Sequence, residues 1–202
     1  RKTPPALQGA FSCALGGLPQ TTGAAKRKSM RGYFAVGVEG ISKARNLGAV
    51  MRTAHAFGGS FVFTVGAANR AREMFQTDTA KTTENLPYYD WETVDDMALP
   101  RGCQIVGVEL TDDAVELPSF RHPRMAAYVL GKERGDLSPE MLERCAHVVK
   151  IPTKFCVNLS VAAAIALYDR TLCLGGYPER PVMPGGPLED KQHVWGAPKK
   201  RT

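Results

Sequence analysis

Acidic residues are absent from the first part of the chain. None precedes Glu39, although the 202-residue sequence contains 20 Asp and Glu residues in all. The same stretch holds six basic residues, whose charge equals the net charge of +6 of the whole chain, so the remainder is balanced. A near-neutral body with a basic arm is typical of a protein that binds a polyanion such as nucleic acid. A solvated leader that only aids solubility has the same composition, so charge alone leaves both interpretations open.

Several signatures of other protein classes are also missing. No run of about 18 apolar residues occurs, so we expect no transmembrane helix. The apolar stretch AFSCALGGLP is too short and too rich in Gly, Ser and Pro to be interpreted as a signal peptide. The five cysteines are odd in number and lack CxxC spacing, which favours buried thiols in a reduced, cytoplasmic protein over disulfides or a metal site.

Composition divides the chain into three parts. Residues 1–31 are rich in Gly, Pro, Thr, Lys and Arg without periodicity, which predicts a flexible basic leader. Residues 176–202 repeat Gly and Pro and are interpreted as an irregular basic tail. Between them, residues 32–175 alternate strand-like and helix-like segments. This alternation predicts one α/β domain with a mostly parallel sheet flanked by helices.

Apolar patterning predicts the elements of this domain. Continuous apolar runs predict buried strands, and apolar residues at helical spacing predict helices. A brief strand in NLPYYDW is expected to lead into a helix that starts near Glu92, and Ser138 before Pro139 is a predicted helix start. The other expected strands cover residues 33–40, 60–66, 103–110, 125–131 and 147–152, and the expected helices cover residues 46–58, 139–145 and 156–169.

Polar residues follow expected strands at three places, and ligands of open α/β sheets bind beyond the carboxyl ends of the strands. At the first place, Asn46 begins a helix and is either its N-cap or a functional residue. Arg52 falls within the apolar stripe of the same helix. It is either a snorkelling side chain or a guanidinium held against a phosphate or ribose.

The second and third places combine glycines or a proline turn with polar side chains. Glu133 lies between Gly131 and Gly135, a spacing that fits neither a dinucleotide motif nor a P-loop, and it is either a solvated carboxylate or a site residue. Asn158 opens an apolar helix, where free N–H groups suit a carboxylate or phosphate. Asn158 is either a plain N-cap or a site residue, and Ser160 is expected to take the routine capping or packing role.

Taken in order, these segments resemble the three motifs of one family. N-x-G-A-x-x-R-T-A-x-A-F-G, V-L-G-x-E-x-x-x-L-S, and I-P followed by N-L-S-V-A-x-A-I-x-L-Y are similar to the motifs of the SpoU/TrmH family of SPOUT-class RNA 2'-O-ribose methyltransferases. The resemblance covers residues 33–174. It implies a C-terminal trefoil knot within the α/β domain and S-adenosylmethionine as the cofactor. It also implies a homodimer, with the helices of the first and third motifs near the interface.

The resemblance assigns site residues by position. Arg52 is expected to contact the ribose hydroxyl and its phosphate. Because the pKa of arginine is above about 12, we favour stabilisation of the developing alkoxide over general-base catalysis. Asn46, Glu133 and Asn158 complete the expected catalytic set and orient Arg52 and the nucleotide. The expected cofactor-binding residues are Glu109, Leu130, Gly131, Ile151, Val157 and Leu159, and no metal is expected.

Cys156 is the one departure from the family pattern that bears on the site. The family commonly has serine at this position, and a thiol is a poorer hydrogen-bond partner than a hydroxyl. Either the serine is dispensable here or substrate positioning differs.

The predicted function is ribose 2'-O-methylation of RNA. We favour tRNA over rRNA because the short leader cannot build a separate RNA-binding domain. Two alternatives stay open. A related SPOUT enzyme could methylate a base nitrogen, although the arginine of the RTA sequence argues against it. A non-catalytic RNA-binding homologue is disfavoured by the joint presence of the four expected catalytic residues.

Overall fold

Seven parallel strands form the centre of the domain. The computed structural model describes residues 32–68, 86–132 and 135–175, and its strands pair in the order β3-β2-β1-β6-β4-β7-β5, each pair parallel. This confirms the predicted α/β class, while the predicted leader and tail lie outside the described residues. The strands are β1 (Tyr33–Glu39), β2 (Phe61–Val65), β3 (Tyr88–Trp91), β4 (Gln104–Val108), β5 (Val115–Glu116), β6 (Met125–Leu130) and β7 (His147–Lys150).

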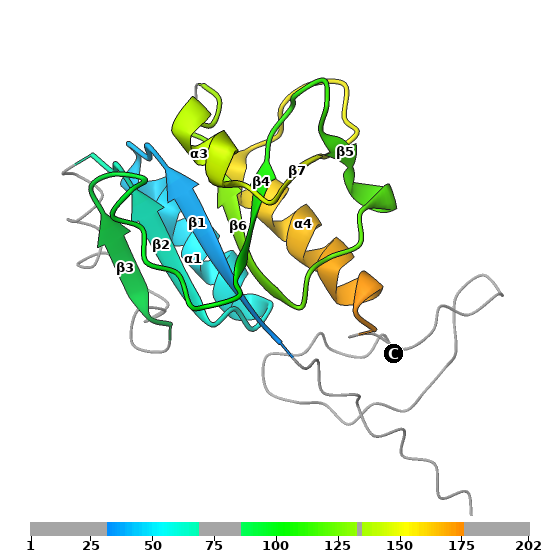
Figure 1. Ribbon diagram of the computed structural model, residues 1–202, viewed down its shortest axis with the longest axis horizontal. Coiled ribbons are helices and arrows are strands. Elements are labelled where there is room, and N and C mark those ends of the chain that lie inside the picture. Colours follow the sequence, from blue (N-terminus) through cyan, green and yellow to red (C-terminus); the bar gives the residue numbers. More distant parts are fainter. Residues whose placement is uncertain (1–31, 69–85, 133–134, 176–202) are drawn as a thin grey trace, which may run out of the picture.

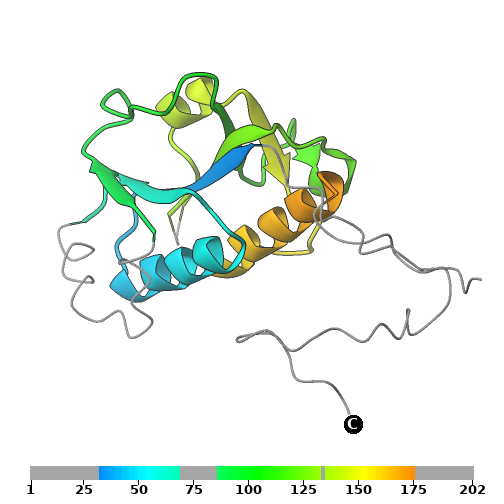
Figure 2. The same cartoon turned by 90° about the horizontal axis from the view of Figure 1, so that it is seen from below.

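Helices cover both faces of this sheet. Helices α1 (Ala44–Ala56) and α4 (Leu159–Cys173) lie side by side on one face, and the short helix α3 (Pro139–Arg144) lies on the other (Figures 1 and 2). Alternate residues of the strands therefore enter two separate cores. Val36 of β1 packs in the core beneath α1 and α4, whereas its neighbour Ala35 packs in the core beneath α3. Because helices cover both faces of the sheet, side chains on both sides of a strand are buried, which explains why the strands are continuous apolar runs in the sequence.

Two expected helix starts are wrong. No helix follows Glu92, because the carboxylate of Asp96 accepts hydrogen bonds from the backbone N–H and the hydroxyl of Thr93 and closes a local turn. Helix α1 begins at Ala44 after Lys43, so Asn46 is not its N-cap but a buried residue of the first turn. By contrast, Ser138 caps α3 as predicted, since its hydroxyl accepts the N–H of Met141.

The described cysteines are free thiols, as predicted, but they are not buried. Cys103 and Cys145 are partly buried, and Cys156 and Cys173 are exposed. The sequence also did not predict β5 or the 3-10 helix η2 (Leu117–Ser119). Both are too short to show an apolar period. β5 exists because Val115 pairs with Val149 of β7, which is a tertiary contact.

A buried polar network ties α4 to the amino ends of the strands. Tyr128 of β6 is held between Arg170 and His122: Arg170 donates to its hydroxyl (3.3 Å), which lies 2.5 Å from Nδ1 of His122. The other ring nitrogen of His122 lies 2.9 Å from a carboxylate oxygen of Asp169. Arg170 is only 2% exposed. Its guanidinium also donates to three backbone carbonyls, those of Tyr33, Pro123 and Arg124.

Burial sets the protonation of this network. It lowers the pKa of His122 below the usual 6.5; Arg170 acts in the same direction and the hydrogen bond to Asp169 opposes it. Burial also raises the pKa of Tyr128 to about 12, so its hydroxyl keeps its proton. The neutral His122 ring therefore accepts from Tyr128 at Nδ1 and donates from Nε2 to Asp169, an assignment made from the hydrogen-bond partners.

We expect the free energy of unfolding to fall as the pH drops below 6.5. The unfolded chain then binds a proton that buried His122, with its lowered pKa, does not bind, so stability present above pH 6.5 is lost towards lower pH. The contribution is at most about 1.4 kcal/mol per pH unit. Urea unfolding at a series of pH values should show a flatter pH dependence for His122→Gln than for the unmodified protein. His55→Gln, which alters an exposed histidine, is the matched control, and equal slopes in all three proteins would contradict the assignment.

Candidate active site

A cavity of about 380 Å³ opens at the carboxyl ends of β4, β6 and β7. Its walls come from the segments that directly follow these strands and from the first turns of α1 and α4. This is the edge at which an open parallel sheet gathers its loops and presents free backbone groups to ligands. The lining residues are Lys43, Arg45, Asn46, Val108, Glu109, Leu110, Leu130, Gly131, Lys132, Gly135, Asp136, Ile151, Thr153, Cys156, Val157, Asn158, Leu159 and Ala162.

The cavity brings together most of the site residues predicted from the sequence. Two of the four expected catalytic residues line it, Asn46 from α1 and Asn158 from the start of α4. All six residues expected to bind the cofactor line it as well. They are Glu109, Leu130, Gly131, Ile151, Val157 and Leu159. Three motifs that are far apart in the sequence thus meet at one place because the parallel sheet places their strand ends side by side.

Asn158 is both the cap of α4 and a wall of the cavity. Its Oδ1 accepts hydrogen bonds from the backbone N–H (3.0 Å) and the hydroxyl (2.9 Å) of Ser160. The expectation that Ser160 takes the capping role is therefore wrong, because Asn158 directly precedes the helix and its amide oxygen accepts from the N–H of Ser160 in the first turn. With Oδ1 engaged, Asn158 faces a ligand through the two N–H donors of its side-chain amide.

Glu109 is held by backbone rather than being free to bind a ligand with both oxygens. Its Oε1 accepts from the N–H of Leu110 (2.9 Å), and its Oε2 accepts from the N–H of Leu137 (3.0 Å). A side chain at Gly131 would begin 3.1 Å from the same Oε2, so the glycine leaves room for this carboxylate. Glu109 thereby joins the end of β4 to the segment that follows β6.

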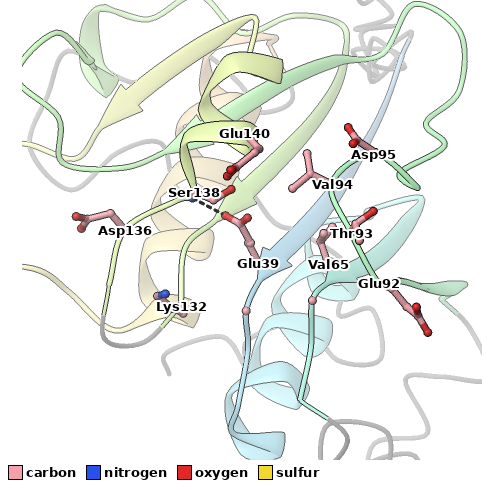
Figure 3. Close-up of a pocket in the computed structure, with 12 residues that line it drawn as sticks. Glu39, Val65, Glu92, Thr93, Val94, Asp95, Lys132, Asp136, Ser138 and Glu140 are labelled. Carbon is pink, nitrogen blue, oxygen red and sulfur yellow. Dashed lines mark hydrogen bonds between the residues drawn. The ribbon is translucent and has the colours of Figure 1, made fainter.

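A second cavity of about 420 Å³ lies beside the first, and the two share Lys132 and Asp136. Figure 3 shows the carboxylates around it and the hydrogen bond in which the N–H of Ser138 donates to Glu39 (2.9 Å). Acidic groups dominate this lining: Glu39, Glu92, Asp95, Asp136 and Glu140. A phosphate backbone would be repelled there and would favour the first cavity, whose rim carries Lys43 and Arg45.

Of the other two expected catalytic residues, only Arg52 is among the residues that the structure describes. Arg52 is exposed and is absent from the lining. Its expected place in the apolar stripe is wrong, because residue 52 lies about 100° around the helix from Met51 and faces solvent. Glu133 lies outside the described residues. Cys156, the departure from the family pattern, is exposed and lines the cavity.

Sequence reasoning missed the basic rim of the cavity. Lys43 and Arg45 flank the start of α1, and Lys132 directly follows Gly131. Their adjacency to the first and second motifs was the available signal, since an anionic substrate needs cations close to the reacting group.

The described residues contain neither a membrane-spanning helix nor a group of side chains placed to hold a metal ion. No helix among residues 32–68, 86–132 and 135–175 is long and apolar enough to cross a membrane. The same residues contain no group of three or more His, Cys, Asp and Glu side chains placed to hold a metal ion.

The sequence model of the SpoU rRNA methylase family matches residues 33–168, which is well over half of the chain. The chain belongs to this family. Family membership confirms the resemblance seen in the three motifs, and the trefoil knot is a feature that membership implies.

Several RNA methyltransferases are similar to the chain over about two thirds or more of its length. The tRNA (guanosine(18)-2'-O)-methyltransferase of Escherichia coli K12 is 29% identical over 142 residues, which cover 67% of this chain and 62% of that protein. The chain thus matches less than two thirds of this relative's length. An AdoMet-bound rRNA methyltransferase of Sinorhizobium meliloti superposes with a TM-score of 0.62 at 22% identity, covering 70% of this chain and 57% of that one. A TrmH/SpoU tRNA-modifying enzyme of A. aeolicus gives 0.59 at 20% identity, covering 76% and 85%.

We expect Glu109→Ala to lower the free energy of unfolding by about 1–3 kcal/mol, because it leaves the partly buried N–H of Leu137 without its acceptor. Urea unfolding measures the change. Glu116→Ala is the control, since it removes an exposed carboxylate from β5. An equal loss in both variants would show that the bond to Leu137 contributes nothing specific.

Proposed function

We propose that this SpoU-family protein is an S-adenosylmethionine-dependent RNA methyltransferase that modifies a ribose 2'-hydroxyl, with tRNA favoured over rRNA. The observation that carries the proposal is the convergence of all three motifs on one cavity. The E. coli relative, named a tRNA 2'-O-methyltransferase, supports the reaction and the substrate class. The S. meliloti neighbour, solved with bound AdoMet, supports the cofactor.

The cavity fits S-adenosylmethionine in size and chemistry. Its volume of about 380 Å³ lies within the usual range of small-molecule sites, about 300–1,000 Å³. Leu130, Ile151 and Leu159 offer apolar walls suited to an adenine ring. When bound, the cofactor supplies an electrophilic methyl group on a sulfonium.

The side chains around the cavity would orient the reactants rather than form bonds to them. Asn158, whose Oδ1 accepts from Ser160, would donate to a ligand from its side-chain amide, and buried Asn46 supports the wall from the first turn of α1. Lys43 and Arg45 at the rim attract the phosphates on either side of the target ribose. Good orientation of two reactants contributes up to about 7–11 kcal/mol to a transfer of this kind.

Arg52 is proposed to stabilise the alkoxide that develops on the ribose oxygen, since a guanidinium stays protonated and donates to oxyanions. It lies about 9 Å along the α1 axis from Asn46, on the exposed side of the helix. From this position Arg52 can contact the reacting ribose in two arrangements. Either the RNA extends over α1, or a second copy of the chain packs against this helix and brings its own cavity to Arg52.

We propose a homodimer formed through α1 and α4. These two helices lie side by side on one face of the sheet (Figure 2). Val161 and Tyr168, seven residues apart on α4, are each 46% exposed and give this face an apolar surface that supports the proposal. The four cysteines among the described residues are free thiols, which agrees with a reduced, cytoplasmic setting.

We expect Arg52→Ala to reduce the rate of methyl transfer by about 10²–10³, the loss typical of removing one donor to a developing oxyanion. The assay uses labelled S-adenosylmethionine with unmodified RNA, followed by mapping of the labelled nucleotide and atom. His55→Ala, about one turn further along α1 and also exposed, is the matched control. A near wild-type rate for Arg52→Ala would remove this arginine from the mechanism.

The same assay separates the proposed function from its alternatives. Label on a ribose 2'-oxygen supports the proposal, and label on a base nitrogen would replace it with base methylation. RNA binding without any transfer would instead indicate a non-catalytic homologue.

Deleting residues 1–31 should weaken RNA binding and flatten its salt dependence, because six basic residues are lost. If all six contact phosphates of a duplex, the slope of log K against log salt falls by about 5. Binding titrations at several salt concentrations measure this slope. An unchanged slope would show that residues 1–31 make no phosphate contacts, and it would leave solubility as their only role.

A further inference from the structure

A third cavity, of about 370 Å³, lies at the opposite edge of the sheet from the candidate active site. It is formed around the amino ends of β4, β6 and β7. Its lining includes two arginines, Arg121 and Arg124, and the imidazole of His147. No acidic residue is among the described residues that line it. The full lining is Gly102, Gln104, Arg121, His122, Pro123, Arg124, Met125 and His147.

The loop that carries the two arginines is anchored from inside. His122 is 4% exposed and is fixed by Tyr128 and Asp169. The carbonyls of the next two residues, Pro123 and Arg124, both accept from the buried guanidinium of Arg170 (2.5 and 2.8 Å). The inward-facing parts of the loop are therefore held, while the side chains of Arg121 and Arg124 are exposed.

The facing wall is held in a similar way. His147, the first residue of β7, lies with Nε2 3.1 Å from the amide oxygen of Gln104 on β4. Its ring meets that of Phe120 edge-on at 5.3 Å. A binding surface that is ordered in advance loses less conformational entropy when a ligand arrives.

The charged side chains that line this cavity are all basic among the described residues. Asp169, the carboxylate that contacts His122, bonds the ring at Nε2 and is not part of the lining. Arg170 adds a buried positive charge behind the loop.

Gly32, the first described residue, packs closely against this loop: a side chain at Gly32 would begin 2.3 Å from the carbonyl of Arg124.

We propose that Arg121 and Arg124, with His147 beside them, bind a phosphate of the RNA backbone at this edge, an inference that rests on the proposed RNA substrate. Guanidinium groups match phosphate oxygens with paired donors. The six residues of β6 span roughly 20 Å between this cavity and the candidate active site, so these arginines bind RNA without touching the reacting ribose. They extend the contact with a structured RNA across the whole depth of the sheet.

The test measures binding of the full chain to an end-labelled tRNA transcript over a range of salt concentrations. The double variant Arg121→Gln/Arg124→Gln should bind about tenfold more weakly at low salt, and its slope of log K against log salt should be smaller by about 0.7–0.9, the value for one lost phosphate contact. In methyl transfer, the variant should raise KM for RNA more than it lowers kcat, because the lost contacts lie far from the reaction.

The matched control is Arg101→Gln, which removes an exposed arginine that does not itself line the cavity, although its neighbour Gly102 does. It should change the slope less than half as much as Arg124→Gln alone. If the double variant binds tRNA within twofold of wild type with an unchanged slope, or if Arg101→Gln matches Arg124→Gln, the phosphate site is overturned while the proposed function stands. If wild type binds tRNA but transfers no methyl group to any RNA, the proposed function fails and the slopes still decide the phosphate site. If wild type does not bind tRNA at any salt concentration, the phosphate site is overturned as well.

Discussion

Two carboxylates fix the chain segment that separates the two cavities at the carboxyl edge. Glu39 at the end of β1 and Glu109 just beyond β4 accept the neighbouring N–H groups of Ser138 and Leu137. Hydrogen bonds to charged acceptors contribute about 1.5–3 kcal/mol each. These two bonds hold the segment that follows β6 against the ends of β1 and β4, the two strands that flank β6 in the sheet. The wall of the candidate active site is therefore built before any ligand binds.

Most of the fold could be predicted from the sequence because the sheet is covered on both faces. A strand such as β6 is then apolar at nearly every position and stands out as a continuous run. Prediction failed where a few polar atoms decide the backbone. Thr93 and Asp96 bond to each other and replace a helix with a turn. Strand β5 was missed because its two residues depend on pairing with β7, which leaves no local pattern.

For the site, motif order carried more information than the geometry of single residues. The resemblance placed Asn158 and Gly131 in a common site, and both line the first cavity. It could not show whether Asn158 or Ser160 caps α4, since both are polar and only the backbone angles at the helix start distinguish them. Nor could it show that Glu109 bonds the backbone of Leu137, because that contact joins residues 28 positions apart.

Helix α4 connects the two edges of the sheet as a rigid rod. Its fifteen residues are about 22 Å long. Near its C-terminal end, Arg170 is clamped to three carbonyls and to Tyr128, while its N-terminal end presents Asn158 to the candidate active site. A rod held at one end transmits a small change of angle there as a larger displacement at the other. The alignment of Asn158 is thus set in part by a buried arginine at the far side of the molecule.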